Sequence, residues 1–305
     1  MMSSVVDLED FRSRAFYLSS AANASLYIHN RFAELGLWVE YQELIVEGFL
    51  VRNVIAVLNG TNPEAPQYLY GAHFDSANLN VDNYSDGEKF AAPGADDDAS
   101  GVAATIELAT VLHDERFEST IKFVAFAAEE SGLNGSLAFV LRESARGVRY
   151  ADTVIMDMIG YRRESTNSAF MFSNNASNTM VGAVRAAITE RHLNLSLTTI
   201  SNVLIDASDH YPFWLAGYPS VLVIEEMANN RPVNPGYHTE NDTSDSLSME
   251  QMTVITEALL AGFLTLQTPQ EEKSSYAAWI ISGLVIIAVV ALSSLYVLRR
   301  RKVLE

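Results

Sequence analysis

Acidic side chains and histidines follow apolar runs at several points of this 305-residue chain. The runs are YLYGA, KFVAFAA and TVIM. Two further segments carry such residues: YHTENDT contains a histidine, and PGADDDASG contains three consecutive aspartates. The residues concerned are His73, Asp75, Asp96–Asp98, Glu129, Glu130, Asp157 and His238. Imidazole nitrogens and carboxylate oxygens are common protein ligands of divalent metals. Because the chain contains no cysteine, a metal site must use these groups.

The apolar runs of four to six residues alternate with helical patterns, which is typical of buried parallel strands with crossover helices. Helices are predicted near 20–35, 100–113, 136–142, 179–192 and 248–266, with a short one around SDHYPFWLAG. Ligands bind beyond the carboxyl ends of the strands in such folds. The pattern therefore predicts one α/β domain over residues 1–268, with the acidic and histidine residues gathered at one edge of its sheet.

A solvated acidic surface or a calcium loop could also account for the three adjacent aspartates. The chain carries a net charge of −18, and acidic runs usually lie on solvated faces. An EF-hand calcium loop requires acids at alternating positions and a glycine at its sixth position, and DDD lacks that spacing. The acidic balance also argues against nucleic acid as a partner, since few cations are available to neutralise phosphates.

In their order along the chain, GAHFDS, PGADDDASG, AAEE, DMIGY and YHTENDT resemble the M28 family of co-catalytic di-zinc metallopeptidases. The resemblance covers about residues 53–266. It implies a three-layer α/β/α sandwich around a mixed, mostly parallel sheet. It also implies two Zn²⁺ ions per chain and peptide substrates.

Carried over position by position, the resemblance implies that His73 and Asp157 bind one zinc ion, and that Glu130 and His238 bind the other. Asp96, the first of the three aspartates, would bridge both ions. A bridging carboxylate offsets the repulsion between two divalent cations roughly 3.5–4 Å apart. The remaining two aspartates would orient the loop or the helix start, and the peptide bond after the bridging residue is often cis in the family.

Three further residues receive catalytic roles from the resemblance. Glu129 would be the general base, while its neighbour Glu130 holds metal. Asp75 lies two residues after His73, so the two side chains share a face of an extended segment, and the carboxylate can accept the other imidazole N–H. Tyr237 would donate to the developing oxyanion, and His210 would be structural or outside the ligand set.

The function implied is that of an aminopeptidase hydrolysing the N-terminal residues of peptides. A carboxypeptidase or dipeptidase of the same fold would need a basic clamp, for which Arg162, Arg163 and Arg231 are candidates by position alone. We also consider a single-zinc glutaminyl cyclase and a non-catalytic membrane ectodomain. The sequence carries no indication of the oligomeric state.

The C-terminal region differs in composition from the rest of the chain. Residues 276–298 contain no charged side chain, and a helix of that length is about 34 Å long at 1.5 Å per residue, enough to span a membrane. A polar linker, 269–275, precedes this predicted transmembrane helix, and a basic tail, 299–305, follows it. Because flanking Lys and Arg favour the cytoplasmic side, we expect a cytoplasmic C-terminus and an extracytoplasmic catalytic domain.

Two observations bear on that orientation. The N-terminus shows no secretory signal, so a tail-anchored, cytoplasmic enzyme is the alternative. Seven N-x-S/T triplets, the acceptors of N-glycosylation, agree with the extracytoplasmic arrangement.

Overall fold

A computed structural model describes residues 1–80, 90–203, 205–228 and 231–267. Residues Met1–Leu266 form one compact unit. The predicted linker, membrane span and basic tail lie outside the described residues. Within the described part, no helix combines the length and the apolar composition that a membrane crossing requires.

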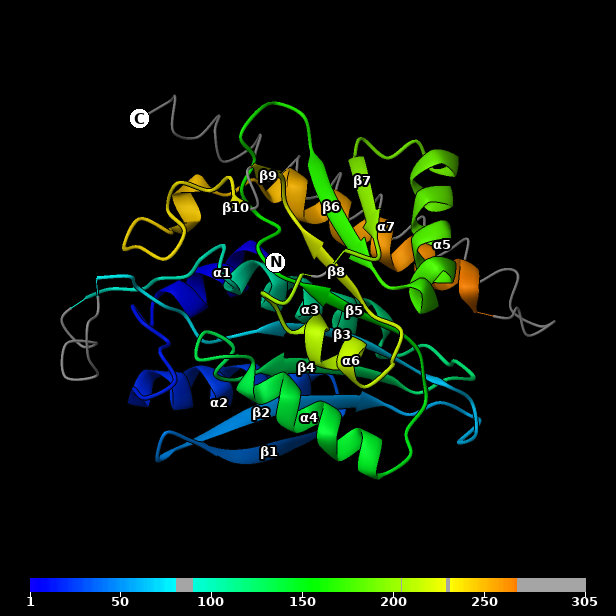
Figure 1. The fold of residues 1–305 in the computed structure, drawn as a ribbon, viewed down its shortest axis with the longest axis horizontal. Coiled ribbons are helices and arrows are strands. Elements are labelled where there is room, and N and C mark those ends of the chain that lie inside the picture. Colours follow the sequence, from blue (N-terminus) through cyan, green and yellow to red (C-terminus); the bar gives the residue numbers. More distant parts are fainter. Residues whose placement is uncertain (81–89, 204, 229–230, 268–305) are drawn as a thin grey trace, which may run out of the picture. The chain divides into compact units, whose positions relative to one another are not determined.

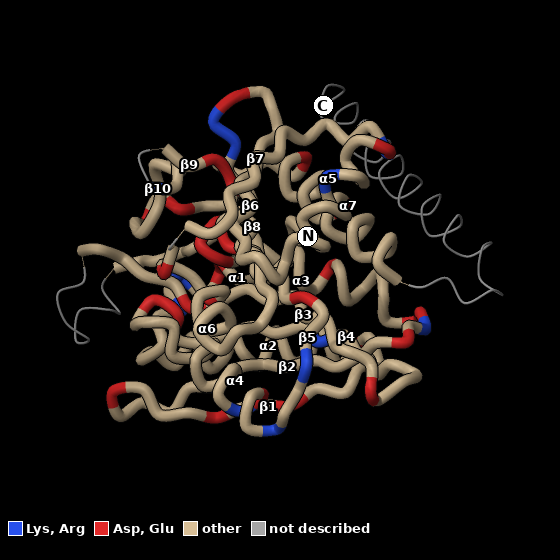
Figure 2. Tube along the Cα trace, turned by 45° about the vertical axis from the view of Figure 1, so that its right-hand side comes forward, with Lys and Arg blue, Asp and Glu red and all other residues tan. Residues whose placement is uncertain are grey.

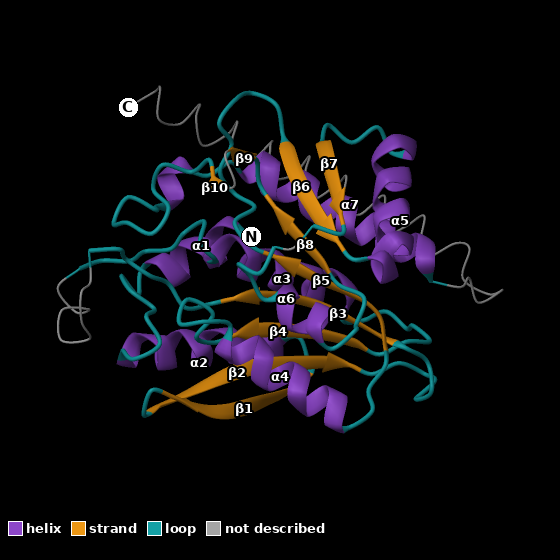
Figure 3. Cartoon of the chain, viewed as in Figure 1, coloured by secondary structure: helices purple, strands orange, loops and turns teal. Residues whose placement is uncertain are grey.

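Helices and strands are interspersed along the compact unit (Figures 1 and 3). The strands are β1 (Trp38–Val46), β2 (Phe49–Leu58), β3 (Gln67–His73), β4 (Ile121–Phe126), β5 (Tyr150–Met156), β6 (Ser168–Ser173), β7 (Ser196–Ser201), β8 (Val221–Ile224), β9 (Met227–Ala228) and β10 (Arg231–Pro232). The helices are α1 (Met2–Glu9), α2 (Ser19–Glu34), α3 (Ala99–Leu112), α4 (Asn134–Ala145), α5 (Asn178–Glu190), α6 (His210–Leu215) and α7 (Met249–Leu266), with 3-10 turns η2 (Asn175–Ser177) and η3 (Ser244–Ser246).

Eight of the strands form one mixed sheet in the order β1-β2-β4-β3-β5-β8-β6-β7. β3, β4, β5 and β8 are parallel to one another in the centre, and β6 is parallel to β7. The pairs β1–β2, β2–β4 and β6–β8 are antiparallel. The large mixed sheet predicted from the sequence is thus confirmed, and the carboxyl ends of its four central parallel strands meet at one edge.

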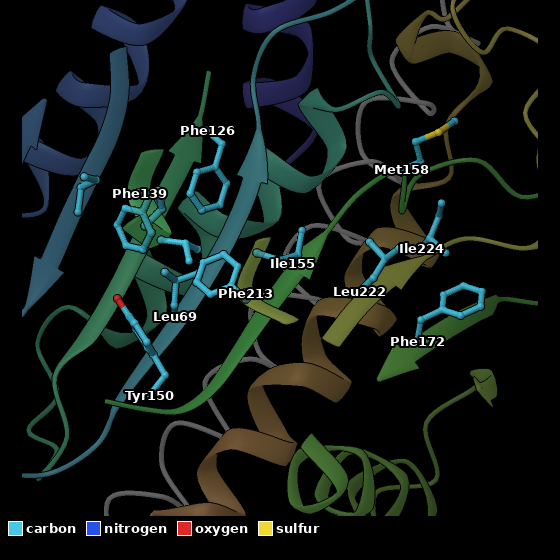
Figure 4. Close-up of a cluster of buried hydrophobic side chains, with 13 residues drawn as sticks. Leu69, Phe126, Phe139, Tyr150, Ile155, Met158, Phe172, Phe213, Leu222 and Ile224 are labelled. Atoms are coloured by element: carbon cyan, nitrogen blue, oxygen red, sulfur yellow. The ribbon is translucent and has the colours of Figure 1, made fainter. Parts of the chain in front are cut away.

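Helices cover both faces of this sheet, and consecutive residues of β3 show the two layers. Leu69 belongs to an apolar cluster with Phe139 of α4 and Phe213 of α6 (Figure 4). Tyr70 points to the opposite face, where its ring lies 6.1 Å from that of Phe263 in α7. Side chains alternate between the faces of a strand, so the continuous apolar runs of the central strands serve both layers.

The predicted helices appear within a few residues of their expected bounds, but α1, β1, β7 and the two-residue strands β9 and β10 were not predicted. β1 and β7 are the two edge strands, and their residues are mostly half-buried or exposed. Edge strands therefore lack the apolar runs that identified the central ones.

Helix α3 begins directly beside the end of β5. The Asp98 carboxylate caps the helix by accepting the Gly101 N–H (2.9 Å). A Cβ on Gly101 would lie 2.4 Å from the Met156 carbonyl oxygen, so only glycine permits this close approach. The close packing brings the aspartate loop that precedes α3 to the carboxyl edge of the sheet.

Candidate metal centre

Two histidines from distant parts of the chain face a single carboxylate at this edge. His73 ends β3, and His238 lies in the loop between β10 and η3. The two oxygens of Asp97 lie 3.1 Å from the Nε2 atoms of His73 and His238 respectively. Each imidazole also has a second carboxylate neighbour: Asp157 is 3.8 Å from His73 Nε2, and Glu130 is 2.9 Å from His238 Nε2. The arrangement is two histidine–carboxylate pairs joined through Asp97.

The structure corrects the prediction that Asp96 occupies the shared position. The oxygens of Asp96 accept hydrogen bonds from the Gly160 N–H and the Asn234 amide, both at 2.8 Å. Its side chain is therefore turned away from the histidines, and Asp97 takes the place between them. The order of three identical residues in a loop does not reveal which of them faces the site.

The rest of the aspartate loop has a structural role. Asp98, besides capping α3, accepts the backbone N–H of His73 (3.2 Å) and of Met158 (3.2 Å). The expected role at the helix start therefore holds for Asp98 but not for Asp97. The cis peptide bond, which the resemblance put after Asp96, joins Asp97 to Asp98.

Asp75 organises the segment that carries the two glutamates. Its Oδ1 and Oδ2 accept the backbone N–H groups of Glu129 (3.0 Å) and Glu130 (3.2 Å). The predicted bond from the His73 imidazole to this carboxylate is not formed, since Nδ1 and Oδ1 are 3.6 Å apart. His73 Nδ1 instead donates to the Asp75 carbonyl oxygen (3.1 Å). This bond leaves Nε2, the nitrogen facing Asp97, as the ligand atom of a neutral imidazole.

The donor set fits a pair of divalent metal ions. Asp97 Oδ2 and Glu130 Oε1 are buried and accept no well-formed hydrogen bond within the described part of the chain. Buried carboxylate oxygens normally have a partner, so these two are suited to receive a cation. Two groupings of converging ligand atoms overlap at His73: one with Asp97 and Glu130, the other with Glu129 and Asp157. Acidic positions also gather beside β8 and α6 in Figure 2.

The local charges shift the protonation of these groups strongly. Burial alone would lower the pKa of His238, but the Asp97 and Glu130 carboxylates raise it to about 10. Burial would raise the pKa of Asp97, yet its contacts with His238 and His73 hold it below the usual range. Burial raises the pKa of Glu130 to about 7, helped by the charge of Asp97, and raises that of Glu129 well above its ordinary value. Without metal, the imidazoles therefore carry protons that a cation must displace.

A cavity of about 540 Å³ opens onto this cluster. The tyrosine predicted to act on the oxyanion, Tyr237, lines it and stacks on His238 with ring centroids 3.8 Å apart. Burial raises the pKa of its phenol, so the group stays a hydrogen-bond donor at neutral pH. The rest of the lining includes apolar side chains, namely Ile205, Leu222, Ile224 and Met227.

Two residues near the site fall outside the predicted ligand set. His210 is fully buried, its Nε2 lies 3.0 Å from the Ile205 carbonyl oxygen, and burial lowers its pKa to about 3. It belongs to neither grouping of converging ligand atoms among the described residues. Asp242, which we did not predict, accepts the backbone N–H groups of both Asp96 (3.1 Å) and Asp97 (3.0 Å). Its position in YHTENDT, four residues after His238, was the only available signal.

Comparison with known proteins identifies the family. The model of peptidase family M28 matches residues 53–262, more than half of the sequence. The chain belongs to peptidase family M28. The matched segment contains every residue of the histidine–carboxylate cluster.

Relatives of this M28 chain include zinc-dependent enzymes. It is 28% identical to aminopeptidase YwaD of Bacillus subtilis over 203 residues. The aligned region covers 66% of this chain but only 41% of YwaD. A solved structure of BSAP, a zinc aminopeptidase from Bacillus subtilis, matches with 26% identity and a TM-score of 0.60, over 73% of this chain and 52% of that one. The chain thus spans about half or less of the length of these two relatives.

A third match concerns the fold alone. A glutaminyl cyclase from Porphyromonas gingivalis superposes with a TM-score of 0.72, covering 87% of this chain and 96% of the cyclase, at 19% identity. The mixed α/β architecture is therefore shared between peptidases and a cyclase, and the site must distinguish them.

Proposed function

We propose that this chain is a co-catalytic di-zinc aminopeptidase with Glu129 as its general base. The observation that carries the proposal is the pair of histidine–carboxylate sets joined at Asp97. Glu129 lies beside them, and its backbone N–H donates to the Asp75 carboxylate. His73 and Asp157 would hold one zinc ion, His238 and Glu130 the other, and Asp97 both.

Bound zinc would supply Lewis-acid polarisation of the scissile carbonyl and acidify the attacking water. Glu129 would accept the proton of that water and return it to the leaving amine nitrogen. Burial raises the pKa of its carboxylate well above the ordinary value, so it holds a proton more readily than an exposed glutamate, which suits it to this exchange. Tyr237 would donate a hydrogen bond to the developing oxyanion from its place beside His238.

The cavity favours substrates that present an amino terminus and an apolar side chain. The negative charge around the cavity favours an ammonium group over a carboxylate, and the apolar lining suits an aliphatic or aromatic residue. Of the three arginines considered for a carboxylate clamp, Arg162 pairs with Glu250 and Arg163 pairs with Glu226.

Two alternative functions, a carboxypeptidase or dipeptidase and a glutaminyl cyclase, are each supported by a different observation. Arg231 lines the cavity, so a carboxypeptidase or dipeptidase would depend on this side chain. A glutaminyl cyclase is favoured only by the fold match. It would use one metal ion, whereas this site carries two histidine–carboxylate sets.

One assay separates these activities. The full chain in detergent is offered leucyl and alanyl arylamides with a free or an acetylated amino group, N-acetylated dipeptides, and a peptide with N-terminal glutamine. We expect hydrolysis of the free aminoacyl substrates only, its loss with a chelator, and its return with zinc. Cleavage of the acetylated dipeptides would support the carboxypeptidase, and loss of ammonia from the glutamine peptide without hydrolysis would support the cyclase. No turnover of any of them with zinc present would favour a non-catalytic ectodomain.

We further propose that residues 276–298 anchor the enzyme in a membrane as a single-pass helix, with the catalytic domain outside the cytoplasm and residues 299–305 inside. The uncharged stretch and the RRRK sequence after it support this orientation. Protease added to intact cells should then digest the domain. Digestion only after the membrane is broken would support the tail-anchored, cytoplasmic arrangement and would leave the peptidase proposal unaffected.

A further inference from the structure

The segment before α2 lies against both loops that carry the candidate metal ligands. The Ala92 N–H donates to the Arg12 carbonyl (2.7 Å), and Ser13 forms an isolated parallel bridge with Ala92. The Arg14 N–H donates to Ser76 Oγ (2.9 Å), which in turn donates to the Ala92 carbonyl (2.7 Å). The segment thus connects the loop after β3 to the loop before α3.

Arg14 fixes these loops through its side chain. It is fully buried, and its guanidinium donates to the carbonyl oxygens of Phe74 (2.6 Å), Gly94 (2.8 Å) and Leu8 (3.1 Å) and to that of Pro93. Phe74 is the residue between His73 and Asp75. Pro93 and Gly94 stand four and three residues before Asp97. One planar group therefore holds the backbone immediately after His73 against the backbone that leads to Asp97.

Among the described residues, the Arg14 guanidinium pairs with no carboxylate within 4.0 Å, and its hydrogen bonds all go to backbone carbonyl oxygens. The carboxylates that act on it electrostatically are Asp242, Asp75, Asp97 and Asp98, all in or beside the metal centre. A buried cation without a paired anion is unfavourable unless the surrounding field compensates. The acidic cluster supplies that field.

Arginine is the side chain suited to this position. Its planar fork presents five donors in fixed directions, and it stays charged when buried. A lysine would keep the charge, but its single ammonium cannot reach carbonyls on three separate segments. The position therefore requires both the charge and the fork.

We propose that Arg14 is a positioning residue of the metal centre, which holds the His73–Asp75 loop and the Asp97 loop at the separation that zinc binding requires. Residue 14 precedes the segment matched by the family model, so this role extends the site beyond that segment. The inference rests on the proposed two-zinc function. Removal of the Arg14 guanidinium should therefore weaken zinc binding 10- to 100-fold, which is the usual effect of losing a residue that orients metal ligands.

The experiment compares three variants of the full chain in detergent: Arg14→Met, Arg14→Lys and the control Lys122→Met. Lys122 is also a buried cation, but it lies at the start of β4 and pairs with Glu143, so its loss should destabilise the fold away from the site. Zinc affinity is measured by competition with a chromogenic chelator, and stability by thermal unfolding of the zinc-free protein. We expect Arg14→Met to raise the zinc dissociation constant 10- to 100-fold, Arg14→Lys to raise it by less, and Lys122→Met to lower the unfolding temperature with unchanged zinc affinity.

A zinc dissociation constant of folded Arg14→Met within twofold of the original would overturn the proposal, as would an equal loss of affinity in Lys122→Met. If Arg14→Met does not fold, the zinc affinities of Arg14→Lys and Ser76→Ala are measured instead. Ser76→Ala removes the hydroxyl that accepts the Arg14 N–H and donates to the Ala92 carbonyl. Unchanged zinc affinity in both would refute the positioning role. Failure of the original chain to bind zinc would instead refute the proposed function.

Discussion

Replacing Asp97 or Asp96 with asparagine tests which aspartate lies between the histidines. Both side chains are buried, and both changes remove one charge with little change in volume. Asp97→Asn takes away the only carboxylate that lies within 3.1 Å of both imidazoles among the described residues. Asp96→Asn alters a side chain that accepts hydrogen bonds from Gly160 and Asn234 and does not face the histidines.

The expected effects differ in kind. Losing a residue that only orients a metal ligand weakens metal binding 10- to 100-fold. Loss of a shared ligand should reach at least the upper value, which corresponds to about 2.8 kcal/mol at 1.4 kcal/mol per tenfold. Asp96→Asn keeps one of the two oxygens that accept hydrogen bonds and replaces the other by an amide NH2. The lost hydrogen bond should lower the free energy of unfolding by about 1–3 kcal/mol. Its effect on zinc should be small, because Asp242 continues to hold the Asp97 backbone.

Zinc content after dialysis, chelator competition and denaturant unfolding of the zinc-free protein measure these effects. Asp97→Asn should lose at least one zinc ion, whereas Asp96→Asn should retain two and differ mainly in stability. The reverse result, with zinc lost in Asp96→Asn and retained in Asp97→Asn, would refute the geometry and restore the sequence-based assignment.

Three further predictions concern the base, a remote buried acid and the aspartate loop. Glu129→Gln should lower kcat about 10²- to 10⁴-fold with zinc content unchanged, whereas Glu130→Gln should lose zinc; the opposite pattern in turnover and zinc content would exchange their roles. Burial raises the pKa of Asp152 to about 7 from the ordinary 3.8, so the stability this acid contributes is present below about pH 4 and is lost as the pH rises through 7. Asp152→Asn should therefore be more stable than the original at pH 8, by up to roughly 4 kcal/mol, but not at pH 4, and parallel pH profiles of unfolding would contradict this. Gly94 has a φ of +53°, and a Cβ there would lie 2.3 Å from the Asp97 carbonyl oxygen; Gly94→Ala should lower both the unfolding temperature and the zinc affinity, and an unaffected zinc affinity would separate this loop from the site.

The central strands and most helices were predictable because burial leaves a simple pattern. β3, β4 and β5 are almost wholly buried, so their apolar runs stand out and their ends locate the polar residues that follow. His73, Glu130 and Asp157 were found in this way. The edge strands β1 and β7 were missed because partly exposed strands mix polar and apolar residues without a clear run.

Side-chain direction within a loop was not predictable. Asp96, Asp97 and Asp98 have the same chemistry, and only the folded backbone turns the first toward Gly160, the second toward the histidines and the third toward α3. Arg14 escaped notice for a related reason. Its partners are carbonyl oxygens, which every residue possesses, so no sequence motif marks the position.

In the proposed mechanism, two zinc ions act together at the joined histidine–carboxylate sets. The most direct test is a zinc titration of the chelator-treated full chain, with bound zinc per chain and aminopeptidase activity measured on the same samples. We predict binding of two ions per chain, with full activity reached only as the second is bound. One tightly bound ion at saturating zinc, with full activity, would contradict the account.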